Sequence, residues 1–148
     1  MTTITHRLSA KCPPAALWDI LSDLTAVQTY NPMVRSARIE GTQRQGTGAM
    51  RRCELLPNGE ILERVTTWEV GRSLGLEIVE SDWPVRSMSW VTTVEPVGAG
   101  CDLVQRLDYQ MKYGPAGWVL NALVMRRAIE TNVGRALSGL IARAEART

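Results

Sequence analysis

Few residues of this sequence could carry acid–base chemistry, and Glu63 is the first to consider. It shares a strand face with Ile61 and Val65, but the opposite face also carries apolar residues, so alternation alone leaves its direction open. If Glu63 points inward, its carboxylate needs a partner and could act as a general acid or base. If it points outward, it is a surface carboxylate that pairs with a neighbouring arginine.

Arg51 is the second residue with site chemistry. It shares a strand face with Cys53 and Leu55, and this face is more apolar than the opposite one, so we expect it to look inward. A guanidinium at that position could hold an anionic group of a ligand or pair with Glu63. The alternative is a strand-end arginine that reaches solvent along its apolar stem.

Other reactive residues are scarce, which excludes several classes of site. His6 is the only histidine, and it lies in an alternating stretch that predicts a strand side chain. Cys12, Cys53 and Cys101 are widely spaced and odd in number, so we expect neither a metal site nor a disulfide framework, in keeping with a reducing cytoplasm. No phosphate-binding glycine motif occurs, and we expect no cofactor.

The composition is that of one ordinary globular domain spanning residues 1–148. Hydrophobic residues make up 45% and charged residues 22%, and the net charge is +2. So small a charge predicts no nucleic-acid partner. No apolar run approaches the roughly 20 residues of a membrane span, and residues 1–14 contain no apolar signal core. We therefore expect a cytoplasmic protein without stable membrane insertion, as a monomer or homodimer.

The elements that must position these residues follow from the periodicity of the chain. Two short helices are expected after the first strand, at Ala15–Leu21 and near Ala26–Tyr30, because prolines precede the first and Pro32 limits the second. Period-two patterns and glycine or proline turns predict strands at residues 2–11, Val34–Glu40, Gly48–Leu56, Ile61–Val70, Ser73–Glu80, Arg86–Pro96 and Asp102–Tyr113. The short connections predict antiparallel pairing.

The C-terminal segment Ala116–Ala146 predicts one long helix of about 30 residues, which spans roughly 45 Å. Apolar residues recur at helical spacing along one face: Trp118, Ala122, Met125, Ile129, Val133, Ala136, Leu140 and Ala144. The sheet must cover one of its own faces. The predicted class is therefore α+β, with a curved seven-stranded antiparallel sheet wrapped around the long helix in the order β-α-α-β6-α.

This order of elements resembles that of the START-like or SRPBCC superfamily, the helix-grip or birch-pollen-allergen-like proteins, and in particular its bacterial members labelled polyketide cyclase/dehydrase. The matching motifs are 17-LWDILSDLTAVQTYNPMVRSARIEG-41, 50-MRRCELLPNGEILERVTTWEV-70 and 112-KYGPAGWVLNALVMRRAIETNVGRALSGL-140. The resemblance covers nearly the whole chain. It implies an apolar cavity between sheet and helix, and it favours an inward direction for Glu63.

The resemblance also implies where a ligand would lie. The break at Tyr30, Asn31 and Pro32 would be at the opening, where Tyr30 could bond a ligand or simply pack, and Asn31 could orient a ligand or only form a turn. In the strand Asp102–Tyr113 either Leu107 and Tyr109 or the alternate residues point inward. The full set of expected ligand-binding residues is Tyr30, Asn31, Arg51, Glu63, Leu76, Ile78, Met88, Trp90, Tyr109, Met125 and Asn132, although core packing also explains the apolar ones.

Three functional hypotheses follow. The first is a carrier or sensor that binds a hydrophobic small molecule, such as a lipid, polyketide or aromatic compound, in the cavity. The second is a polyketide cyclase- or dehydratase-like enzyme in which Glu63 and Tyr109 serve as acid–base groups. The third is a protein-interaction module, which the sequence supports less because no extended apolar or charged surface run stands out.

Overall fold

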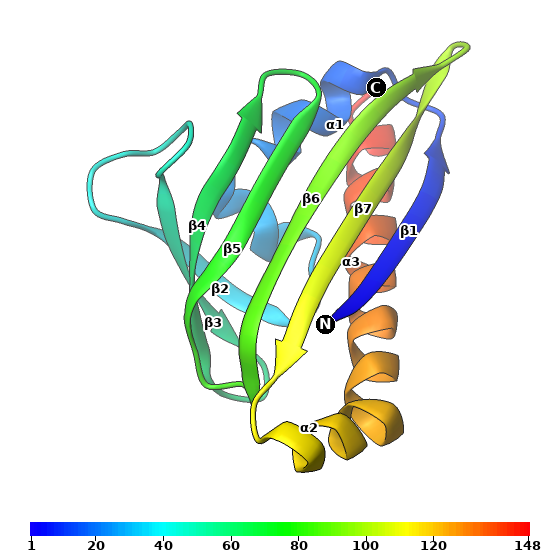
Figure 1. Ribbon diagram of the computed structural model, residues 1–148. Coiled ribbons are helices and arrows are strands. Elements are labelled where there is room, and N and C mark those ends of the chain that lie inside the picture. The colour runs from blue at the N-terminus through cyan, green and yellow to red at the C-terminus, as the bar shows by residue number, and fades with distance from the viewer.

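The computed structural model describes all residues 1–148, and Figure 1 shows one curved sheet folded around a long helix. The strands are β1 (Thr2–Ala10), β2 (Val34–Glu40), β3 (Met50–Leu55), β4 (Glu60–Glu69), β5 (Ser73–Ser81), β6 (Val85–Val97) and β7 (Gly100–Met111). The helices are α1 (Pro14–Leu21), the 3₁₀ helix η1 (Leu24–Thr29), α2 (Gly114–Leu120), the π turn η2 (Asn121–Met125) and α3 (Arg126–Ala146).

The sheet is antiparallel throughout, with the strand order β1-β7-β6-β5-β4-β3-β2. The chain runs from β2 to β7 through adjacent hairpins, and only β1 is placed beside a strand far along the sequence. The concave face of the sheet holds α3, while α1 and η1 cover one end (Figure 1). The predicted helix-grip fold is confirmed.

The register of β7 is the one with Leu107 and Tyr109 inward. Both are buried, whereas Arg106 is exposed. The alternative register would have buried the charges of Arg106 and Asp108 and exposed Leu107 and Tyr109, and both changes cost free energy. Apolar alternation therefore decides the register.

The C-terminal helix departs from the prediction in its first third. Its apolar stripe was expected to face the sheet from Trp118 onward, but Trp118 is 72% exposed and Ala122 is also exposed. The cause is the π turn, in which the N–H of Arg126 donates to the carbonyl of Asn121, five residues back. One extra residue in a turn rotates the preceding segment by roughly 100°. The stripe is confirmed only from Ile129 onward.

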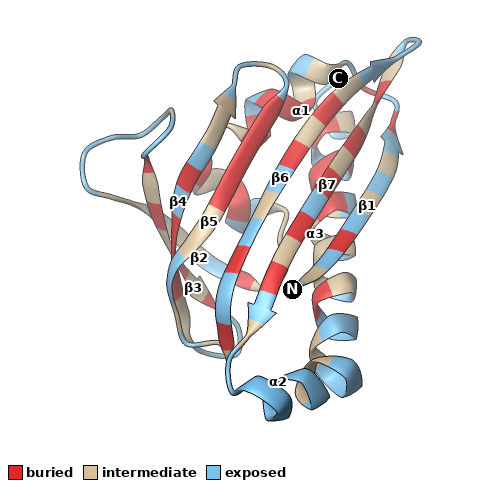
Figure 2. Ribbon diagram, in the orientation of Figure 1, coloured by how far each residue is buried: buried red, intermediate tan, exposed pale blue.

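The core lies between the concave face and the packed side of α3, and Figure 2 shows α2 as pale blue, exposed ribbon beyond it. The largest cluster joins α1, β5, β7 and α3 through residues such as Leu17, Leu74, Leu103 and Leu140. Gly139 sets how closely α3 approaches η1, because a Cβ there would collide with the main-chain oxygen of Tyr30. None of the helices combines the length and the apolar character that a membrane span requires.

Candidate functional site

A mostly apolar cavity of about 150 Å³ lies between the sheet and α3. Strands β2 to β7 each supply lining residues, and α3 closes the other side with residues from Ile129 to Leu140. Leu74, Leu76, Leu137 and Leu140 belong both to this lining and to the largest core cluster, so the cavity borders the packed core. An apolar cavity of similar size in another protein stays dry and takes up benzene.

Most of the side chains expected from the sequence are brought together here. Eight of the eleven line the cavity, namely Tyr30, Asn31, Arg51, Glu63, Leu76, Met88, Trp90 and Asn132. Three do not, namely Ile78, Tyr109 and Met125. Ile78 instead packs half-buried between two smaller core clusters, and Met125 packs against the cluster that contains Ile129.

Tyr109 was expected in the cavity but serves the packing between β7 and the π turn. It is fully buried, and its hydroxyl donates a hydrogen bond to Oδ1 of Asn121. Asn121 in turn donates from Nδ2 to Oγ1 of Thr2 over 3.2 Å. Burial raises the pKa of the Tyr109 hydroxyl. The structure therefore does not bring Tyr109 and Glu63 into one acid–base site in the cavity lining.

Arg51 and Glu63 form a buried ion pair in the cavity wall. They are directly opposite one another on β3 and β4, and their side chains are only 5% and 2% exposed. Arg51 donates from Nε to Oε1 of Glu63 over 3.2 Å and from Nη2 to Oε2 over 3.0 Å, which is a two-pronged contact. The inward direction of both residues and their pairing are confirmed.

The remaining polar atoms of this pair are also occupied. Nη1 of Arg51 donates to the carbonyl of Leu24 over 3.1 Å, and Sγ of Cys53 donates to Oε1 of Glu63 over 3.1 Å. Burial, the largest single effect, lowers the pKa of Arg51, but the charge and hydrogen bonds of Glu63, together with Cys53 and Tyr30, outweigh it and the pKa is raised. Burial, reinforced by the same carboxylate, raises the pKa of Cys53. The pair thus neutralises its own charges within the lining.

Tyr30 and Asn31 lie where η1 gives way to β2. Oδ1 of Asn31 accepts from the N–H of Met33 over 3.0 Å, which is the side-chain turn expected before a proline. Tyr30 is half-buried, and burial raises the pKa of its hydroxyl while the charge of Arg51 acts in the opposite sense. Asn31 therefore fulfils its turn role and lines the cavity as well.

The expected set omits two polar residues of the lining, Thr92 on β6 and Gln105 on β7, and Gln105 is the more informative of the two. It is 9% exposed, its Nε2 donates to Oγ1 of Thr92 over 3.1 Å, and its Oε1 has no hydrogen-bond partner. The signal was available, because Gln105 alternates with Leu103 and Leu107 on the inward face. A polar residue between two apolar ones in that register is a candidate for contact with a ligand.

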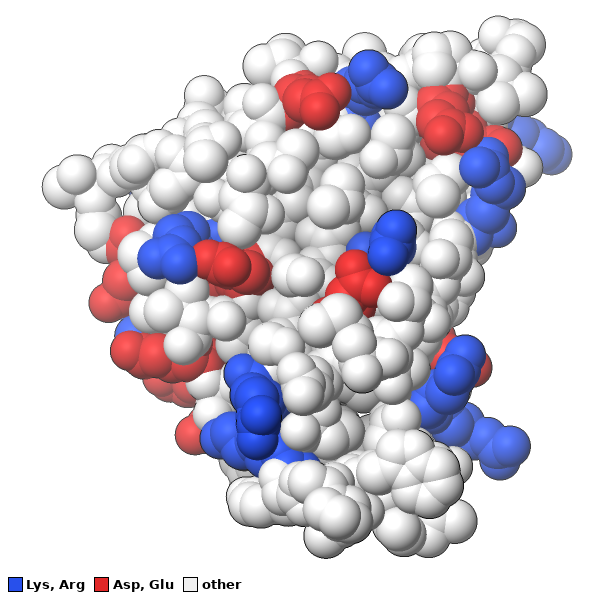
Figure 3. Space-filling model, viewed as in Figure 1, with Lys and Arg blue, Asp and Glu red and all other residues white.

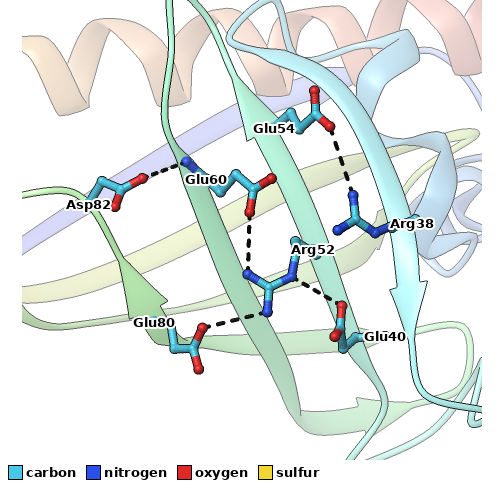
Figure 4. A network of polar contacts seen from close by, with 7 residues as sticks. All are labelled: Arg38, Glu40, Arg52, Glu54, Glu60, Glu80 and Asp82. Carbon is cyan, nitrogen blue, oxygen red and sulfur yellow. Dashed lines mark hydrogen bonds and ion pairs between the residues drawn. The ribbon is translucent and has the colours of Figure 1, made fainter.

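The outer face of the strands that carry Arg51 and Glu63 is charged, unlike the mostly apolar inner face. Arg52 lies among three carboxylates there, at 3.1 Å from Glu40, 3.4 Å from Glu60 and 3.5 Å from Glu80 (Figure 4). The Arg52 side chain is 19% exposed, but its three carboxylate partners are 41–65% exposed to water, which weakens each pair. The same strands thus carry a solvated ionic network outside and an apolar wall with one neutralised pair inside.

The comparison with family models identifies the chain. The model described as "Polyketide cyclase / dehydrase and lipid transport" matches residues 1–145. The chain belongs to this family. The family's scope supports the binding of hydrophobic molecules in general, and the expected resemblance is confirmed. No curated protein sequence matches the chain significantly.

Solved structures agree on the fold. TTHA0849 from Thermus thermophilus superposes with a TM-score of 0.83 at 19% identity, covering 99% of both chains. XoxI from Bacillus cereus gives 0.76 at 15% identity, covering 95% of this chain and 93% of its own. Ara h 8.0201, a birch-pollen-allergen-like protein, gives 0.74 at 13% identity, covering 99% and 96%. At such identities the likeness shows the helix-grip architecture alone.

Proposed function

We propose that this protein binds a small, largely apolar molecule in the cavity between the sheet and α3, as a carrier or sensor. The observation that carries the proposal is the lining itself. It is mostly hydrophobic, and its two charged members, Arg51 and Glu63, satisfy one another. Such a wall offers favourable burial to an apolar body and no free charge to an ionic one.

The size of the cavity narrows the ligand class. About 150 Å³ accommodates one aromatic ring or a branched alkyl group of similar bulk with a short substituent. The polyketide cyclase-like alternative has less support. The carboxylate of Glu63 already accepts hydrogen bonds from Arg51 and Cys53, and Tyr109 is engaged with Asn121 outside the lining.

Titration with p-xylene tests the proposal, because Trp83 and Trp90 line the cavity and report on its contents. Ala136→Phe places a ring in the cavity from α3, whereas Ala142→Phe adds the same ring on the exposed side of that helix. We expect saturable fluorescence changes in the wild type and Ala142→Phe, and at least a tenfold weaker affinity in Ala136→Phe.

Native mass spectrometry of freshly purified protein complements the titration, because a resident molecule would both block p-xylene and identify the ligand class. Equal affinity in the two phenylalanine variants would place the bound p-xylene outside the cavity. Absence of both saturable binding and a co-purified small molecule would refute the proposed function.

A further inference from the structure

Three polar side chains form a row across the concave face of the sheet. Thr92 on β6 is directly opposite Gln105 on β7, and Gln105 is directly opposite His6 on β1. Side chains opposite one another on one face have Cβ atoms about 4.5–5.5 Å apart. His6 points towards α3, since a Cβ at Gly134 would lie 4.0 Å from its Nε2. The row therefore faces the space between sheet and helix.

This row contains both of the buried side-chain polar atoms that lack a hydrogen-bond partner, Oε1 of Gln105 and Nδ1 of His6. Buried polar atoms almost always have partners, so two neighbouring exceptions require an explanation. Gln105 and Thr92 both line the cavity, and Gln105 is only 9% exposed. The unpaired carbonyl oxygen thus belongs to a wall that is mostly apolar and whose two charged side chains pair with one another.

The row is separate from the Arg51–Glu63 pair. Strand β5, which contributes Leu74 and Leu76 to the lining, lies between β6 and β4. The distance from β6 to β4 across the sheet is about 10 Å, twice the spacing of adjacent strands. A ligand whose apolar body lies on Leu76 can therefore direct a polar substituent towards Gln105 without disturbing the ion pair.

We infer that Gln105 is the hydrogen-bonding contact of the cavity and that it selects a ligand with a hydroxyl group on an apolar body. The inference rests on the proposed function and specifies its ligand class. A hydroxyl can donate a hydrogen bond to Oε1 of Gln105, which lines the cavity and lacks a partner. An apolar ligand of the same shape would leave this oxygen unpaired.

A matched pair of probes tests this, because p-cresol and p-xylene differ only by hydroxyl in place of methyl. We expect Gln105→Leu to bind p-xylene at least as well as the wild type and to lower the affinity ratio of p-cresol to p-xylene by about tenfold. Gln110→Leu, on the exposed face of β7, is the control and should keep the wild-type ratio. Gln105→Met repeats the test with a different side chain if the leucine variant folds poorly.

The outcomes separate the two proposals. If both probes bind and the ratio is unchanged in Gln105→Leu and Gln105→Met, the role of Gln105 is overturned while the cavity-binding function stands. If neither probe binds the wild type and no small molecule co-purifies, the proposed function fails and the inference fails with it.

A second inference rests on the surface of α2 and the π turn, independently of the cavity. Four apolar side chains are exposed there, Trp118 by 72%, Leu123 by 75%, Val124 by 54% and Val119 by 48%. They form an apolar end surface, in contrast to the expectation that no apolar run stands out at the surface. The end of the molecule that carries α2 is white in Figure 3, with basic groups above it on both sides.

The charged residues of the segment that forms this apolar end surface are all basic, and one of them, Arg126, pairs with Glu130 on α3 over 3.0 Å. Lys112, Arg126 and Arg127 are the charged residues of the segment, and no acidic residue occurs between Asp108 and Glu130. A helix surface with tryptophan, leucine and valine beside lysine and arginine is typical of helices that lie in the interface of an anionic membrane. In a symmetric dimer through this surface, the basic groups of two copies would face each other, which disfavours self-association.

The geometry points to an anionic lipid bilayer as the partner of the apolar end surface. Co-sedimentation with vesicles containing roughly 30% phosphatidylglycerol should show binding that weakens with added salt, whereas pure phosphatidylcholine vesicles should bind much less. The double variant Trp118→Ser/Leu123→Ser should lose binding at least tenfold. Val70→Ser/Val97→Ser, which removes exposed valines from two distant hairpins, should not.

Absence of vesicle binding by the wild type would overturn this second inference. So would equal binding by the two double variants. Analytical ultracentrifugation supplies the competing outcome, since a dimer that dissociates in Trp118→Ser/Leu123→Ser would assign the apolar end surface to self-association.

Discussion

Removing either partner of the Arg51–Glu63 pair should destabilise the protein more than removing both. Arg51→Met leaves a carboxylate that is 2% exposed without its cation, and Glu63→Leu leaves a guanidinium that is 5% exposed without its anion. Loss of one member of such a pair costs about 3–5 kcal/mol, because the remaining charge stays buried and unpaired. The double variant loses mainly the hydrogen bonds to Leu24 and from Cys53, which are worth about 1–2 kcal/mol in total.

Urea unfolding followed by tryptophan fluorescence at neutral pH gives the four stabilities of the cycle. Coupling of about 3 kcal/mol or more is expected. The matched control is Arg64–Glu77, which lies on the outer face of the neighbouring strand pair with side chains 47% and 35% exposed. Its cycle should yield at most about 1 kcal/mol. Additive effects at Arg51 and Glu63, or equal coupling in the two cycles, would refute the view that the inner pair is held as a desolvated unit.

Three further outcomes are expected. Gly139→Ala should destabilise the protein by about 1–3 kcal/mol in urea unfolding, because its Cβ meets the main chain of Tyr30. Gly134→Ala should stabilise the protein by up to about 1 kcal/mol, and equal stabilities of the two variants would contradict the close contact at Gly139. Burial raises the pKa of Cys101 from 9.0 to about 11, so the stability from its neutral thiol should be complete below pH 9 and be lost from there towards pH 11. Cys101→Ala should reduce the loss of stability between pH 9 and pH 11, and an unchanged pH profile of stability would count against a buried neutral thiol at Cys101. Arg52→Gln should lower the urea midpoint only slightly, and by less at high salt. A large, salt-independent loss of stability would argue against a solvated network.

Much of the fold could be predicted because strands such as β3 and β7 alternate between buried and more exposed positions. That pattern fixed the direction of Arg51, and the resemblance resolved the ambiguity at Glu63. The first third of the long helix could not be predicted in this way. Its apolar residues continue the spacing of α3, but the π turn rotates them away, and no residue type signals a π turn as proline signals a kink.

The site residues could be predicted to a similar degree, and the prediction was wrong at Tyr109 for a similar reason. Neighbouring strand positions such as Leu76 and Trp90 line the cavity because their whole face does. Tyr109 lies on the same face as Leu107, but two residues further along β7, where the sheet meets the π turn. There its hydroxyl donates a hydrogen bond to Asn121. Periodicity gives the face of a side chain, whereas its distance along the cavity depends on how the helix crosses the sheet.

Because of the π turn, the deletion of a single residue would change which side chains of the C-terminal helix face the sheet. Deletion of one codon within Asn121–Met125 would restore ordinary helical bonding and turn the preceding residues by roughly 100° relative to the sheet. Trp118 would change direction together with the whole of α2, although no amino acid in that segment had been altered. In homologous genes, a one-residue difference in length here would mark which proteins present an apolar end surface and which keep those side chains against the fold.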